Sequence, residues 1–261
     1  MAAGTAAVTA TAAGFRLRPL AALLPLAVLA AGVLVWDLVI VGRGNFATPT
    51  AGEVLAAIPR VFTSSAAWQA LWTSDLSLLA GYLIAAALGV PVGLLMARNA
   101  TLDRVLMPYL EIAVVIPMAV MMPVVMIALG LTRTAQIVVI VLFALPFIVA
   151  ATRGGARTIP RAWIDMGRVF GATESQTWRH VLVPGSIATV VAGLRLGFAQ
   201  ALTGLVTVEL TLIALGIGTQ IISYQSHFQS ADLFAFVGLL MLQSVLVIAG
   251  LHALQARVEK R

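Results

Sequence analysis

Long apolar runs separated by short polar connections fill the chain from residue 20 onward. Six of these runs reach about 20 residues, the length that an α-helix needs to cross the hydrocarbon core of a bilayer. Because unpaired backbone N–H and C=O groups are costly in lipid, each run must be helical. The pattern therefore predicts an all-α polytopic transmembrane bundle. The six predicted spans are Leu20–Val41, Leu76–Ala97, Val105–Gly130, Ala135–Thr152, Ser186–Leu210 and Ala231–Leu251.

The chain divides into a short leading segment and one membrane domain. Residues 1–18 are rich in Ala and Thr and lack apolar periodicity, so we expect a disordered cytoplasmic N-terminus. Residues 19–261 then form a single transmembrane domain. The first apolar run follows Arg16 and Arg18, as a secretory signal would. It exceeds the ~7–15 apolar residues of a signal core, so we expect a retained anchor.

An outer segment precedes the second run. Residues 48–72 predict an amphipathic helix, capped by Thr48 or Thr50. Such a helix either lies on the outer leaflet or helps to seat a partner protein.

Composition supports the membrane assignment and excludes several classes of site. The chain is 61% hydrophobic and 10% charged, and it has no cysteine. Disulfides, thiolate metal ligands and cysteine nucleophiles are therefore excluded, and we expect no metal site. Lys260 is the only lysine, so an ATP-binding Walker A loop, which needs Gly-Lys-Ser/Thr, is absent. The three histidines lie at or beyond span ends without partners for a catalytic triad, so no catalytic residue is predicted.

Basic residues are distributed unevenly between the two sides of the membrane. With six spans and the N-terminus inside, the outer side holds Arg43, Arg60 and Arg133, and Arg195 falls within a span. This positive-inside bias predicts cytoplasmic N- and C-termini. The arginines are too scattered for a nucleic-acid-binding face. The twelve inner residues are Arg16, Arg18, Arg98, Arg104, Arg153, Arg157, Arg161, Arg168, Arg179, Arg257, Lys260 and Arg261.

The inner connection at about residues 160–183 is polar but has helical periodicity. Pro160 suits the first turn of a helix, and Gly171 suits the left-handed position just past its end. The apolar face of this helix is formed by Trp163, Met166, Val169 and Phe170.

A second short helix is predicted directly after this bend. Thr173 and Gln176 form a capping box that opens it, and it is expected to stop before Pro184. On residues alone, the connection is either an interfacial helix whose arginines meet anionic headgroups or an element gripped by a partner protein. The apolar side of the second helix is formed by Trp178, Val181 and Leu182.

The same connection resembles the coupling loop of ABC-importer permeases, whose pattern is close to E-A-A-x-x-x-G-A with a later Pro in L-P. Gly171, Ala172 and Pro184 match this pattern, Asp165 replaces the Glu, and Met166-Gly167 replaces the Ala pair. The resemblance implies contact with an ATPase. The residues it places in the coupling loop are Trp163, Asp165, Gly167, Arg168, Phe170, Gly171, Ala172, Thr173, Trp178 and Pro184.

Further short motifs are similar, in order and spacing, to permeases of the nitrate/sulfonate/taurine group. The resemblance covers roughly residues 76–251. It implies a homodimer in the bacterial inner membrane, two cytoplasmic ABC ATPase subunits that hold ATP and Mg²⁺, and a periplasmic or lipid-anchored solute-binding protein. No cofactor is expected on the chain itself. The motifs are Gly89-Val90-Pro91-Val92-Gly93, Pro108 with Glu111, Pro117 with Pro123, Gly193-Leu194-Arg195-Leu196-Gly197 and Val208-Glu209-Leu210.

The function implied is import of a small solute, an organic or inorganic anion such as a sulfonate, taurine or nitrate, by alternating access. Closure of the ATPases would move the coupling loops and turn the cavity from the outside to the inside. The alternative is a gradient-driven secondary transporter, which predicts inverted repeats and coupling carboxylates at mid-membrane. No internal repeat is evident, and the central spans are nearly free of acids.

Polar residues within spans are costly unless they are paired or face water, so they are candidates for the translocation pathway. For the glutamines, the alternative role is interhelical hydrogen bonding, worth about 0.6 kcal/mol on average in membranes. For Arg195, it is snorkelling to the cytoplasmic face or an interhelical bond. Glu209 is expected near the outer mouth, facing water or gating entry. The pathway candidates are Gln136, Arg195, Gln200 and Glu209.

Prolines, glycines and methionines within the spans suggest how the bundle is shaped. Prolines there free a backbone carbonyl and can kink a helix, which serves either bundle shape or a hinge. Gly193-x-x-x-Gly197 suits a close helix approach, with the seam between two copies as one location. Met118, Met122 and Met126 share a helix face, which favours plain packing. The candidate kinks are Pro91, Pro117, Pro123 and Pro146.

Overall fold

The computed structural model describes residues 27–28, 30–39, 48–116, 118–211 and 215–259. Every regular element over these residues is helical, so the all-α prediction is confirmed. The expected disordered segment 1–18 lies outside the described residues. In chain order the elements are α2 (Ala51–Thr63), α3 (Ser65–Arg98), α4 (Ala100–Val115), the 3₁₀ turn η1 (Met118–Met121), α5 (Met122–Leu129), α6 (Arg133–Arg157), α7 (Arg161–Val169), α8 (Glu174–Thr177), the π-turn η2 (Trp178–Leu182), α9 (Val183–Thr211), α10 (Ile217–Ser226) and α11 (Ser230–Glu259).

Within the described residues, four helices are long and apolar enough to cross a bilayer, and they match the second, fourth, fifth and sixth predicted spans. Of the first predicted span, the described part is an apolar helix over Ala30–Val39. The 34 residues of α3 give it a length of about 51 Å, well beyond the ~30 Å hydrocarbon core. Its first turns therefore extend beyond the core, where Trp68 and Trp72 are exposed. The four candidate spans are Ser65–Arg98, Arg133–Arg157, Glu174–Thr211 and Ser230–Gly250.

The third predicted span, Val105–Gly130, was wrong as a continuous helix. α4 ends at Val115, and Ile116 adopts an extended conformation with ψ 129°. The ring of a following proline disfavours the helical region for the residue before it, and Pro117 follows here. Pro117 itself lies outside the described residues. Pro123 then sits in the first turn of α5, so it starts a helix and does not kink one.

The outer segment also divides where one helix was predicted. Ser64 ends α2 and caps α3, with its side chain accepting from the Ala67 N–H. Thr50, one of the two predicted caps, caps α2 through a complete capping box with Glu53.

Helices α3, α6 and α9 pack closely through glycines. An added Cβ at Gly89 of α3 would stand 2.8 Å from Ile148 of α6, and one at Gly197 of α9 would stand 2.2 Å from it. No side chain larger than hydrogen fits at either position. The Gly193-x-x-x-Gly197 motif therefore packs against α6 within the chain and does not form a seam between copies, because α6 already occupies its face.

Two of the span prolines lie within helices, and two of the span methionines are buried between helices. Pro91 and Pro146 lie inside the continuous helices α3 and α6. Met122 and Met126 are buried against Val139 of α6, as plain packing predicts.

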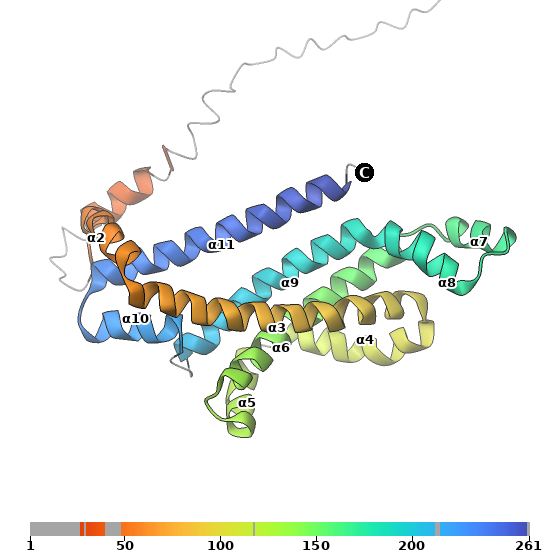
Figure 1. Cartoon of the computed structure of the whole chain (residues 1–261), viewed down its shortest axis with the longest axis horizontal. Helices are drawn as coiled ribbons and strands as arrows, with labels where there is room; N and C mark the ends of the chain where they lie inside the picture. Colours follow the sequence, from red (N-terminus) through yellow and green to blue (C-terminus); the bar gives the residue numbers. More distant parts are fainter. Residues whose placement is uncertain (1–26, 29, 40–47, 117, 212–214, 260–261) are drawn as a thin grey trace, which may run out of the picture.

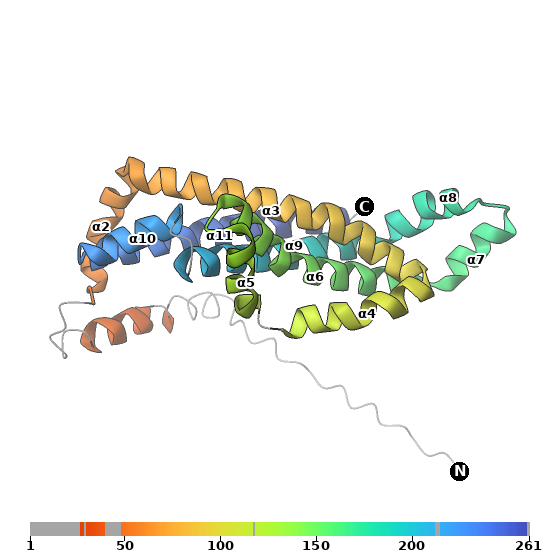
Figure 2. The same ribbon diagram turned by 90° about the horizontal axis from the view of Figure 1, so that it is seen from below.

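The bundle is elongated: α2 and α10 lie at one end, and α7 and α8 project from the other, in both views (Figures 1 and 2).

Candidate functional site

The bend between α7 and α8 is built by local backbone hydrogen bonds. α7 ends at Val169 with Phe170 as its C-cap, and Gly171 takes the left-handed conformation with φ +73°. The Gly171 N–H donates to the Arg168 carbonyl and the Ala172 N–H to the Gly167 carbonyl, each at 2.9 Å. This pair of bonds is a Schellman motif, which satisfies the last carbonyls of the helix. The predicted helix end at Gly171 is thus confirmed.

The capping box that opens α8 is also present. The Thr173 Oγ1 accepts from the Gln176 N–H at 3.3 Å, and the Thr173 N–H donates to Gln176 Oε1 at 2.8 Å. These reciprocal bonds satisfy two donors that would otherwise be free at the helix start. The direction of the chain after the bend is therefore set within a few residues.

The predicted stop before Pro184 was wrong. The helix that starts at Glu174 runs through the π-turn η2 directly into α9, so the candidate span extends over Glu174–Thr211. Pro184 has no N–H, and its ring would clash with the fourth carbonyl before it in a regular helix. The π-turn widens the backbone just before the proline, with the Val183 N–H bonding to the Trp178 carbonyl.

The apolar face of α7 is exposed to solvent. Its side chains are far from buried: Trp163 is 51%, Met166 55%, Val169 84% and Phe170 83% exposed. Contiguous exposed apolar surface on a short helix at one end of a molecule marks an interaction site. Trp178 differs from this group, because it is half-buried and lines a cavity behind α7.

An ion-pair cluster joins the start of α4 to the end of α6, the helix that precedes α7. Asp103 at the start of α4 accepts from Arg153 Nη2 at 2.9 Å and from Arg157 Nη2 at 2.8 Å, both on α6. Hydrogen bonding to Arg153 lowers the pKa of the Asp103 carboxyl, and burial opposes that shift. Asp103 therefore remains charged and holds the start of α4 against the end of α6.

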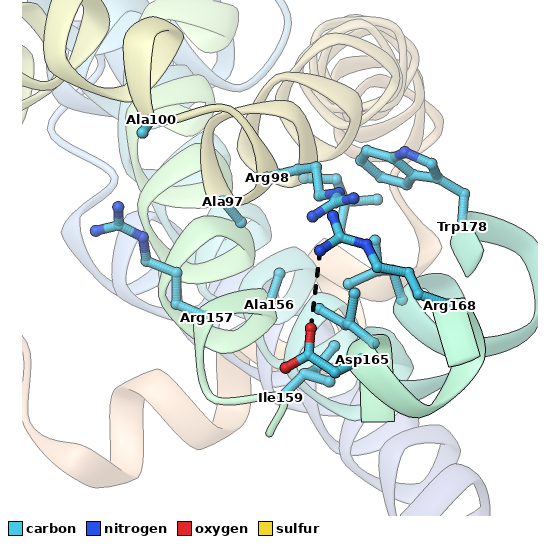
Figure 3. Close-up of a pocket in the computed structure, with 12 residues that line it drawn as sticks. Ala97, Arg98, Ala100, Ala156, Arg157, Ile159, Asp165, Arg168 and Trp178 are labelled. Carbon is cyan, nitrogen blue, oxygen red and sulfur yellow. Dashed lines mark ion pairs between the residues drawn. The ribbon is translucent and has the colours of Figure 1, made fainter. Parts of the chain in front are cut away.

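Two weaker ion pairs involve α7 and α8 themselves. Arg98 at the end of α3 donates to Glu174 of α8 at 3.2 Å. Asp165 and Arg168 of α7 are 3.7 Å apart, one helical turn from each other (Figure 3). The acid at position 165 thus faces its own helix neighbour and the cavity behind α7, away from the exposed apolar face.

Glu209 lies at the other end of the bundle, and the expectation that it faces water was wrong. It is 1% exposed and accepts hydrogen bonds from Ser74 Oγ at 2.6 Å, from Gln136 Nε2 and from the Gly218 N–H at 2.9 Å. The Ile217 N–H donates to Ser74 Oγ at 2.9 Å. The carboxylate therefore ties α3, α6 and α9 to the start of α10.

Of the other pathway candidates, only Gln136 joins Glu209. Gln136 is buried in the Glu209 cluster, which fits its alternative role in interhelical hydrogen bonding. Arg195 and Gln200 are half-buried in α9. The structure does not bring the four candidates together.

Ser74, Asp75 and Asp103 were not among the predicted site residues. Asp75 of α3 accepts from Gln243 of α11 at 2.7 Å. A signal for the α3 contacts was present, because small residues recur at helical spacing along its buried face. These are Ser74, Ser77, Gly81, Ala85, Gly89 and Gly93.

Comparisons with known proteins point to one family. Residues 89–261, more than half of the chain, match the family described as "Binding-protein-dependent transport system inner membrane component". The taurine transport system permease protein TauC of Escherichia coli is 26% identical over 77% of this chain and 73% of its own length. The glycine betaine/carnitine/choline transport system permease protein OpuCD of Bacillus subtilis is 30% identical over 54% of this chain and 62% of its own length.

A solved structure shares the fold. A chain of the inward-facing MetNI methionine ABC transporter aligns with a TM-score of 0.58 and 24% identity, over 74% of this chain and 94% of its own length. The family match spans the coupling loop together with the helices on both sides of it. The chain therefore belongs to the binding-protein-dependent transport system inner membrane components, the permease subunits of ABC importers.

Proposed function

We propose that two copies of this chain form the translocation path of an ATP-driven importer in the bacterial inner membrane. Two cytoplasmic ATPase subunits, which would hold the ATP and Mg²⁺, dock on the coupling loops. A separate binding protein delivers the solute from outside. The chain itself then carries out no chemistry and binds no cofactor.

The exposed apolar face of α7 carries this proposal. Trp163, Met166, Val169 and Phe170 are each more than half exposed in the chain, so their full burial requires a partner. Fully burying a Val, Met or Phe side chain contributes about 1.5–3 kcal/mol, so the face can stabilise a lasting contact.

The loop is also suited to transmit movement. The Schellman motif at Gly171 and the capping box at Thr173 fix the angle between α7 and α8. From Glu174 the helix is continuous to Thr211 in the span. A displacement of α7 by a partner therefore reaches α9 through a rigid helical connection, and the cavity changes sides by alternating access.

Replacing Val169 and Phe170 together by Ser tests the docking face. We expect capture of the ATPase subunit to fall at least about tenfold, because two apolar side chains lose their burial. Membrane levels should stay normal, because both side chains are more than four-fifths exposed. Co-purification of the tagged chain with its ATPase measures the effect.

Phe228→Ser is the matched control, since Phe228 is 90% exposed and follows α10 at the opposite end of the bundle. It should capture the ATPase as the wild type does. Unchanged capture by the double variant would exclude α7 as the docking element. Full solute transport by the chain without any ATPase would refute the importer itself and favour a gradient-driven transporter.

For the solute, we propose a small organic or inorganic anion such as a sulfonate, taurine or nitrate. The alignment with the taurine permease over 77% of this chain supports this class. The shorter alignment with the betaine permease makes a quaternary amine the competing class. Uptake of labelled taurine, nitrate and glycine betaine by vesicles that contain the complete complex distinguishes them.

Arg195→Gln separates the two roles of that arginine. We expect a lower yield of assembled complex with unchanged transport per complex, because a half-buried arginine in a span serves helix packing or snorkelling. Yield is measured by size-exclusion chromatography and transport in reconstituted vesicles. Reduced transport at normal yield, with stimulated ATP hydrolysis intact, would instead place Arg195 against an anionic solute.

A further inference from the structure

A cavity of about 500 Å³ lies behind α7, on the side away from its exposed apolar face. It is lined by the end of α3, the start of α4, the end of α6, α7 and the start of the α8–α9 helix. These elements meet at the inner end of the bundle, where the positive-inside pattern places the cytoplasmic membrane boundary. The volume suits a small-molecule group.

Positive charge predominates in the cavity lining, which holds Arg98, Arg157 and Arg168 against Asp165 alone. The guanidinium of Arg157 is bound to Asp103, outside the lining. In Figure 3, Arg98, Arg168 and Asp165 point toward one another, and Arg157 points away from them. The electrostatic field inside the cavity is therefore set by the positive charges of Arg98 and Arg168.

The acidic partners of these two arginines hold them weakly. Glu174, which pairs with Arg98, has a side chain that is 83% exposed, and such pairs contribute little. The 3.7 Å separation of Arg168 from Asp165 is too long for a hydrogen bond.

Arg98 also carries a donor that is buried without a partner. Its Nε has no hydrogen bond and is enclosed by protein. Leaving such a donor unsatisfied is costly, more so on a charged group. A phosphate in the cavity would bind Arg98 through its terminal guanidinium N–H groups, because arginine binds phosphate through paired N–H donors.

The remaining wall of the cavity is apolar. Ile159 and Leu182 line it, and the half-buried indole of Trp178 lies beside Arg98 (Figure 3). A free inorganic anion would leave this wall unused, whereas the glycerol and upper acyl carbons of a lipid would cover it. Basic pockets between transmembrane helices on the cytoplasmic side are suited to anionic headgroups.

We propose that this cavity binds the phosphate of an anionic phospholipid from the inner leaflet, with Arg98 and Arg168 as its ligands. The headgroup joins the end of α3 to α7. It thereby holds the coupling helix at a defined angle to the bundle. The ATPase docks on the opposite face of α7, so both can bind at once, and the site does not depend on which solute is carried.

Native mass spectrometry of the purified full-length chain, titrated with phosphatidylglycerol, tests the site. We expect retained phosphatidylglycerol and little retained phosphatidylcholine. Arg98→Gln should weaken phosphatidylglycerol binding about tenfold, which corresponds to about 1.4 kcal/mol. Arg168→Gln, whose side chain is 61% exposed in the wild type, should do the same without endangering the fold.

Arg104→Gln is the matched control, because Arg104 is an exposed arginine on α4 at the same end of the molecule and does not line the cavity. Its binding should equal that of the wild type. Equal weakening by Arg104→Gln would show diffuse surface attraction and overturn the site. Displacement of the lipid by millimolar inorganic phosphate would assign the site to a soluble anion. Displacement by the ATPase subunit would assign it to a protein carboxylate, and either result would refute the lipid proposal.

Discussion

Gly171→Val is expected to weaken ATPase capture strongly and leave little transport, while the protein still inserts in the membrane at normal levels. Gly171 has φ +73°, a conformation that costs an L-residue about 1–2 kcal/mol and a β-branched residue more. No atom lies within 4 Å of an added Cβ, so the effect arises from backbone strain and not from a clash. Relief of that strain breaks the Schellman motif and redirects the exposed face of α7 away from its partner.

Gly171→Asn is the control for this prediction, because asparagine tolerates the left-handed conformation better than other non-glycine residues. It should retain most of the capture and transport. Co-purification with the ATPase and uptake by reconstituted vesicles measure both variants. Wild-type capture and transport by Gly171→Val would show that the bend does not carry the coupling.

Glu209→Ala should lower the yield of folded protein more than any of the other single substitutions. The variant removes the acceptor shared by Ser74, Gln136 and the Gly218 N–H. Each buried donor left without a partner costs about 1–3 kcal/mol, so the loss is a large fraction of the ~5–15 kcal/mol stability of a typical domain. The yield of monodisperse protein after detergent extraction, and its thermal transition, measure the effect.

Two variants control for the loss of a carboxylate. Glu209→Gln keeps the side-chain size and one carbonyl acceptor, so its loss of yield should be smaller. Glu111→Ala removes an exposed carboxylate on α4 and should leave the yield unchanged. A normal yield and thermal transition for Glu209→Ala would show that the cluster does not hold the outer end together.

The bend between α7 and α8 was predictable to the residue. Gly171, Thr173 and Gln176 act through hydrogen bonds between neighbours in the chain, and such bonds depend on residue type and spacing alone. The grouping of Trp163, Met166, Val169 and Phe170 on one face of α7 also followed from helical spacing. The π-turn before Pro184 did not, because a proline preceded by a widened turn has the same sequence pattern as a proline that ends a helix.

The burial and contacts of residues within the spans depend on residues that are far away in the chain. Glu209 binds Ser74 and Gln136, which are 135 and 73 positions away in the chain. Its position near the end of a span therefore predicted contact with water, whereas in the structure its carboxylate accepts hydrogen bonds from buried donors. The Gly-x-x-x-Gly pattern around Gly197 predicts a close helix contact without identifying the other helix. The packing of α6 between α3 and α9 makes α6 that helix.

The sequence by itself determined the helical class, four of the spans as continuous helices and the bend of the coupling loop. Each of these follows from hydrogen bonds within a helix or turn, and from the cost of unpaired backbone groups in lipid. The tertiary structure alone decided the Glu209 cluster, the α3–α6–α9 glycine contacts and the arginine-lined cavity behind α7. Those features require side chains from separate helices to meet, and apolar periodicity specifies which face of a helix is buried without specifying its partner.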